Sequence, residues 1–140
     1  MNIIQKLSTG LFAMTICMGA SAADTAPKLT EKQRAALGIC NIATNGVYSI
    51  AHMHQTNVSQ NDARQEVKRF SDALVRDFGD DEITALIRDF WQQGLTEIYK
   101  FDIKPTDEQK IAFAESAAYE AYTVCLDGIL DDADKAAFIR

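Results

Sequence analysis

Apolar residues recur every three or four positions in several successive segments of this chain, which is the period of an α-helix with one buried face. The first stripe begins after Thr30, which together with Gln33 has the spacing of a helix capping box. We expect four main helices, at residues 30–54, 59–78, 80–99 and 106–129. No segment alternates apolar and polar residues in the manner of a half-buried strand. The sequence therefore predicts an all-α fold, a compact bundle of these four helices with a further short helix within residues 131–140.

The N-terminal segment has the features of an export signal. An apolar run at residues 11–18 is followed by the small-x-small tripeptide Ala20-Ser21-Ala22, and the run is too short to span a bilayer. We expect a cleaved signal peptide at residues 1–22 and a single helical domain at residues 23–140, exported to the periplasm or secreted. A lipid anchor on Cys17 is the alternative, disfavoured because the residue before it is not small. No later stretch is apolar enough to predict a membrane span after cleavage.

Two cysteines, Cys40 and Cys125, remain after cleavage of the leader. In an oxidising compartment this even count predicts a disulfide between them, and two buried free thiols are the alternative. The bond would staple the first helix to the fourth, and in the chain-entropy model it would contribute at most about 4–5 kcal/mol. No C-x-x-C motif accompanies it, so we expect a structural role and no redox chemistry.

The segment at residues 80–99 is apolar over well more than half of its circumference. A helix of this kind either lies at the centre of its own core or keeps one face for a partner. We expect Phe90 to be among the most buried residues, because two apolar rows of the helix converge on it. Trp91 and Tyr99 are the candidate partner-binding residues, and the alternative is that both belong to the core. If Trp91 is fully shielded, an interface on this helix fails and a partner must instead dock on the acidic surface.

The motifs needed for catalysis or metal binding are missing from the sequence. The two histidines, His52 and His54, are two positions apart and point in nearly opposite directions on a helix, so we expect both to be solvated and neither to hold a metal. There is no nucleophile elbow, no phosphate-binding glycine loop and no H-E-x-x-H. The sequence thus predicts no cofactor, no metal and no enzymatic activity.

The charge balance limits the class of partner. The chain has 14 basic and 20 acidic residues and a net charge of −6. Proteins that bind nucleic acids instead carry an excess of basic residues, so we expect no nucleic-acid partner. Loss of Lys6 with the leader leaves 13 basic residues and a net charge of −7. This charge would steer the protein toward a basic surface.

Three functions are compatible with these observations. The first is a small exported protein that binds a protein partner, for example as an immunity or inhibitor protein; in size, export and cysteine count the chain resembles the helical, one-disulfide immunity proteins of bacterial competition systems, with which it shares no diagnostic motif. The second is a periplasmic stress or chaperone-like structural protein, and the third an unrecognised hydrolase. The sequence gives no preference for any oligomeric state.

Overall fold

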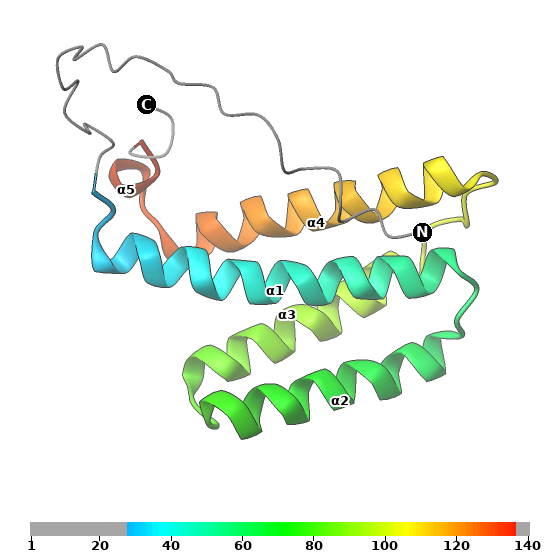
Figure 1. Cartoon of the computed structure of the whole chain (residues 1–140), viewed down its shortest axis with the longest axis horizontal. Coiled ribbons are helices and arrows are strands. Elements are labelled where there is room, and N and C mark those ends of the chain that lie inside the picture. The colour runs from blue at the N-terminus through cyan, green and yellow to red at the C-terminus, as the bar shows by residue number, and fades with distance from the viewer. Residues whose placement is uncertain (1–27, 137–140) are drawn as a thin grey trace, which may run out of the picture.

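The computed structural model describes residues 28–136. Within them the chain forms α1 (Glu31–Gln55), α2 (Gln60–Phe78), α3 (Glu82–Ile98), α4 (Asp107–Ile129) and the short α5 (Asp132–Ala136), and no strand (Figure 1). The predicted all-α bundle of four main helices with a short C-terminal helix is therefore confirmed. The expected signal peptide and the expected end of the last helix near residue 140 lie outside the described residues.

The ends of the helices are set by local capping residues. The Thr30 hydroxyl accepts a hydrogen bond from the Gln33 amide, and the Gln33 side chain accepts one from the Thr30 amide, which completes the predicted capping box. Helix α2 ends at Phe78, and the next residue, Gly79, has a φ of 96°, in the left-handed region that favours glycine. Side chains at the first residue before each later main helix accept from the amide three positions on: Ser59, Asp81 and Thr106.

Helix α1 occupies the centre of the molecule. It packs against α2, α3 and α4, and α2 packs in addition against α3. In Figure 1, α4 and α2 run along opposite sides of α1. Helices α3 and α4 each pack on α1 but hardly contact one another. The two helices are therefore fastened to the same neighbour and not to each other.

The core follows the predicted apolar stripe of α1. Six hydrophobic residues of that helix are buried, at positions three, four or one apart: Ala36, Cys40, Ala43, Val47, Ile50 and Ala51. Four residues of α3 and three of α2 pack around this stripe: Ile87, Trp91, Leu95, Ile98, Ala63, Val67 and Leu74. Burial of such side chains is the main favourable contribution to folding.

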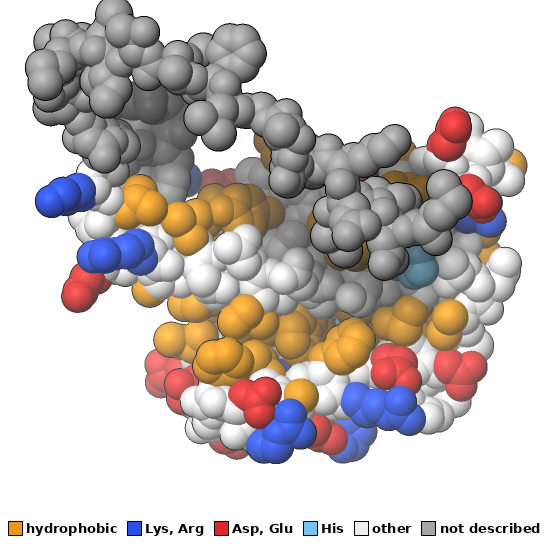
Figure 2. All heavy atoms as spheres, in the orientation of Figure 1, with side chains coloured by type: hydrophobic (Ala, Val, Ile, Leu, Met, Phe, Trp, Pro, Cys, Tyr) orange, Lys and Arg blue, Asp and Glu red, His pale blue; other side chains and the backbone are white. Residues whose placement is uncertain are grey.

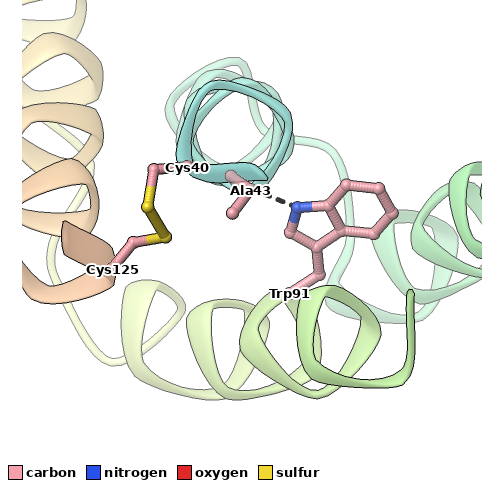
Figure 3. Close-up of a disulfide and its surroundings, with 4 residues drawn as sticks. All are labelled: Cys40, Ala43, Trp91 and Cys125. Carbon is pink, nitrogen blue, oxygen red and sulfur yellow. Dashed lines mark hydrogen bonds between the residues drawn. A yellow bond between two sulfur atoms is a disulfide. The ribbon is translucent and has the colours of Figure 1, made fainter. Parts of the chain in front are cut away.

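Besides apolar packing, one disulfide joins α4 to α1 and one side-chain hydrogen bond joins α3 to α1 (Figure 3). The predicted disulfide between Cys40 and Cys125 is present, with a Cα–Cα distance of 5.6 Å, and joins α1 to α4. On the other side of α1 the indole of Trp91, from α3, lies against Gly46, and its Nε1 donates to the carbonyl oxygen of Ala43 at 2.9 Å. A Cβ at Gly46 would overlap the indole ring, so this close approach requires glycine.

The C-terminal segment is tied to the start of α1. The Gln33 Nε2 donates to the carbonyl oxygen of Asp134 at 2.9 Å, and the Lys32 ammonium pairs with the Asp134 carboxylate at 2.6 Å.

None of the helices in residues 28–136 has the length and apolar character needed to cross a membrane.

Candidate partner-binding groove

The apolar residues of α3 divide into an inner and an outer set. The inner set is the part of the core that α3 contributes, and it includes Trp91, which is only 4% exposed. The outer set includes Leu86, 54% exposed, and Phe90, which is half-buried. The prediction that Phe90 is among the most buried residues is therefore wrong, because the helix turns the neighbouring Trp91 row toward α1.

The structure places Trp91 in the core, which is the alternative stated from the sequence. Its ring is buried, its polar atom has a partner on α1, and its edge packs against Phe70 of α2 with ring centroids 6.2 Å apart. Trp91 is therefore not an exposed anchor for a partner. The expectation that a shielded Trp91 excludes an interface on this helix is wrong, because another face of α3 stays exposed. The apolar residues of α3 that are left partly or largely exposed instead include Leu86 and Phe90.

Tyr99 is half-buried and has a structural hydrogen bond. Its hydroxyl donates to the carbonyl oxygen of Val58 at 3.0 Å, and its ring lies 4.5 Å from that of His54. Burial, with a smaller effect from the negative charge of Asp62, raises the pKa of the Tyr99 hydroxyl. These contacts fix the end of α3 to the connection between α1 and α2.

The expectation that both histidines are solvated is wrong for one of them. His52 is exposed, whereas His54 is buried and its Nε2 lies 2.8 Å from the carbonyl oxygen of Phe101. The adjacent Gln55 is also buried, and its Oε1 accepts from the amide of Lys104 at 2.8 Å. The last turn of α1 thus holds the loop between α3 and α4, a role that sequence reasoning missed because the partners are 47 and 49 residues apart.

An open apolar groove runs between α3 and α4, and we call it the α3–α4 groove. Two hollows of about 450 and 210 Å³ lie along it and share Phe90, Gln93 and Val124. The first hollow extends toward the loop at Phe101, and the second toward the opposite end of both helices at Leu86. Because neighbouring hollows share lining residues, they form one continuous surface feature.

Residues from three helices form this groove. Helix α3 contributes a stripe that includes Leu86, Phe90 and Gly94, and α4 contributes one that includes Phe113, Ala117 and Val124. The floor is α1, through Ile39, Ala43 and Val47. The groove exists because α3 and α4 both pack on α1 and leave a gap between themselves.

At the loop end of the groove, Phe101 is fixed in an exposed position. Its carbonyl oxygen is held by His54, and its ring packs edge-on against Phe113 with centroids 5.6 Å apart. The ammonium group of Lys104, a residue of the same loop, lies over the Phe113 ring at 5.7 Å from its centroid. More than half of the Phe101 side chain nevertheless stays in contact with solvent.

The two helices that form the walls of the groove have an excess of acidic residues. Helices α3 and α4 together contain eight acidic residues and two basic ones, whereas α2 contains four of each. Both basic residues of the walls are engaged in ion pairs, Arg88 with Asp80 and Lys110 with Asp107. In the described part of the chain the only charged residues that line the two hollows are Glu97, on α3, and Glu120, on α4.

A third apolar hollow, separate from the groove, lies between α1 and α2 on the face shown in Figure 2. It measures about 340 Å³, and Phe70, Leu74, Phe78 and Trp91 are among its lining residues. Acidic and basic side chains alternate along α2 beside it (Figure 2). It is smaller than the first hollow of the α3–α4 groove, and Asp77 is the only charged residue of the described chain that lines it.

Among residues 28–136 there is no group of three or more His, Cys, Asp or Glu side chains that could hold a metal ion. One buried polar atom in that range, the hydroxyl of Thr44, has no hydrogen-bond partner. Exposed apolar surface of the kind found in the α3–α4 groove marks sites of interaction with other molecules. The groove is accordingly the best candidate for a binding site in the described part of the chain.

Comparison of the chain with protein-family models, curated protein sequences and solved structures finds no match.

Proposed function

We propose that the protein is a small exported, periplasmic protein that binds a protein partner through the α3–α4 groove and has no enzymatic activity of its own. An immunity or inhibitor protein is the example we favour. One observation carries the proposal: Leu86, Phe101 and Val124, all more than half exposed, line a single groove on one side of the bundle. Large hydrophobic side chains gathered in this way are typical of surfaces that a partner covers.

The rigidity of the surrounding structure supports the same proposal. The α4 wall is bonded to α1 by the disulfide, the α3 wall is held by the Trp91 hydrogen bond, and the loop is held by His54 and Gln55. A groove whose walls and end are fixed in this way loses little conformational entropy when a partner binds.

The non-enzymatic part of the proposal rests on the sequence, in which no catalytic motif has the required spacing. The lining of the groove is consistent with a binding role, because it is mostly hydrocarbon with a few polar groups at the rim.

Photo-cross-linking tests the proposal. A photoreactive amino acid is placed at Val124, inside the groove, or at Tyr119, on the same helix and 76% exposed but outside both hollows. The protein is exported with its own leader in its natural host, irradiated, and the adducts are identified by mass spectrometry. We expect one discrete protein adduct from position 124 and none from position 119.

Other outcomes would separate the remaining functions. A ladder of many different adducts from position 124 would favour the chaperone-like alternative, and an adduct of twice the chain mass would indicate a second copy of the protein. No adduct from either position, or equal adducts from both, would contradict the proposed function.

A further inference from the structure

We infer that the α3–α4 groove receives a cationic amphipathic helix of about three turns, presented by the partner protein. This inference rests on the function proposed above and specifies the chemistry of the partner. It follows from the length of the groove, from the backbone chemistry of its walls and from the distribution of charge along them.

The groove is long enough to hold about three turns of a helix. Its α3 wall runs from Leu86 to Ile98, which at 1.5 Å per residue is about 18 Å. Its α4 wall runs from Phe113 to Ile129, which is about 24 Å on the same scale. A helix of about 12 residues matches the shorter wall.

The walls favour a helix over an extended peptide. Both walls and the floor are α-helices, whose backbone amides and carbonyls are already paired within each helix. An extended segment laid in the groove would bury backbone groups without partners, whereas a helix satisfies its own. A guest helix would take the fourth position of a bundle around the apolar stripe that α1, α3 and α4 leave open.

The charge of the walls selects a basic guest. The eight acidic and two basic residues of α3 and α4 give these helices a strong negative excess, while α2 is balanced. Glu97 and Glu120 stand on opposite walls. Glu97 pairs with the Lys100 ammonium at 2.6 Å, whereas Glu120 forms no ion pair within residues 28–136 and is the acidic side chain open to a basic guest. Lysines or arginines flanking the apolar stripe of a guest helix would lie against these walls.

The same distribution argues against two other occupants. A second copy docked groove to groove would bring two acidic pairs of walls together, and like charges at short distance are repulsive. An anionic lipid surface would be repelled for the same reason. A cationic helix is the occupant that the walls attract.

Binding of designed peptides tests the inference. The probe is a fluorescein-labelled 14-residue peptide of leucine and lysine at helical spacing, and its counterpart has glutamate at every lysine position. Fluorescence anisotropy is measured with the purified, disulfide-bonded protein at physiological ionic strength, where the Debye length is about 8 Å. We expect the leucine–lysine peptide to bind about tenfold more tightly than its counterpart, or better.

Matched variants show whether binding occurs in the groove. Glu120→Lys reverses a charge that lines the groove, and Glu115→Lys reverses an exposed charge of the same helix outside both hollows. We expect Glu120→Lys to weaken binding by about fivefold or more and Glu115→Lys by less than about twofold, because screening confines charge effects to short distances. Leu86→Ser, in the groove, and Ile83→Ser, outside it, form the corresponding apolar pair.

Equal affinity for the two peptides would overturn the inference, as would equal losses in the members of either pair. If Leu86→Ser does not fold, Val124→Ser with Tyr119→Ser as its control gives the same comparison on α4. The proposed function fails separately, through the cross-linking experiment. An adduct from position 124 together with no charge preference among the peptides would leave a protein partner but exclude a cationic helix.

Discussion

The side of α3 that faces α1 and α2 is closed, whereas the side that faces α4 is open. On the closed side Trp91 and Leu95 are buried against α1, and Phe70 of α2 covers the indole edge. On the open side Leu86 and Phe90 line a groove that no element of the described structure fills. Residues of similar hydrophobicity on one helix thus serve folding on one side and are available for binding on the other.

The difference between the two sides has a structural cause. Trp91 fastens α3 to α1 at Gly46, and Cys125 fastens α4 to α1 at Cys40, but the two outer helices hardly contact each other. Each wall is therefore stabilised without closing the gap between them. A bundle built in this way keeps apolar surface exposed without losing its core.

The largest effect is expected from removing the ring on the closed side. Trp91→Ala removes a buried aromatic side chain and its hydrogen bond to Ala43, and should lower the free energy of unfolding by about 3–5 kcal/mol. Phe90→Ala, one position away on the open side, should cost only about 1–2 kcal/mol because the ring is half-buried. Urea denaturation followed by circular dichroism measures both values. Equal losses would contradict the division of α3 into two sides.

Loss of the disulfide should be the next largest effect. The bond joins residues 85 positions apart, so its removal frees the unfolded chain, and we expect a loss of about 2–4 kcal/mol for the Cys40→Ser, Cys125→Ser double variant. Helix content at 25 °C should not change, because the core remains. Far-ultraviolet circular dichroism and thermal melting check the two statements. A collapse of helix content would mean that the bond, and not the core, maintains the fold.

A single methyl group should disturb the contact between α1 and α3. Gly46→Ala places a Cβ inside the volume of the Trp91 indole, and overpacking of this kind costs about 1–3 kcal/mol. Gly38→Ala, on the same helix and with no neighbouring atom near the added carbon, is the control and should be neutral or slightly stabilising. Thermal unfolding distinguishes them. A neutral Gly46→Ala would show that the indole does not need this approach.

A smaller effect is expected at the end of α3. Tyr99→Phe removes the hydrogen bond to Val58 and should cost about 1 kcal/mol. Because the pKa of Tyr99 is raised in the folded state, the native protein keeps its proton at a pH where the unfolded chain has lost it, so stability falls as the pH rises above about 10. Tyr99→Phe should reduce this alkaline loss. Urea denaturation of both proteins between pH 8 and 11 measures how steeply the free energy of unfolding falls with pH. The same slope in Tyr99→Phe as in the wild type would contradict the expectation.

The helices, their caps and the disulfide could be predicted from the sequence because they depend on local spacing and on a count of cysteines. The orientation of α3 could not, because its apolar band is wider than one buried stripe and the period alone does not say whether Phe90 or Trp91 faces α1. Phe78 extends the α2 stripe in the sequence but is 65% exposed at the last turn of its helix.

The groove itself was beyond sequence reasoning for a related reason. It depends on the distance between α3 and α4, which is set by contacts of each with α1 and by the His54 and Gln55 hydrogen bonds to the connecting loop. Those hydrogen bonds join residues far apart in the chain, and a buried histidine has the same local pattern as a solvated one. The acidic excess of α3 and α4 was visible as composition, but its meaning came only from their placement as the two walls.

We expect the open side of α3 to bind a partner and to be dispensable for folding. The yield of the position-124 cross-link in two backgrounds, Leu86→Ser and Ile83→Ser, tests this together with the melting temperature of each variant. Both changes replace an exposed apolar residue of α3, and surface changes of this kind alter stability by about 0.5 kcal/mol or less. We expect Leu86→Ser to lose the cross-link while Ile83→Ser keeps it, with both proteins melting close to the wild type. An undiminished cross-link in Leu86→Ser, or loss of the fold in that variant, would contradict the claim.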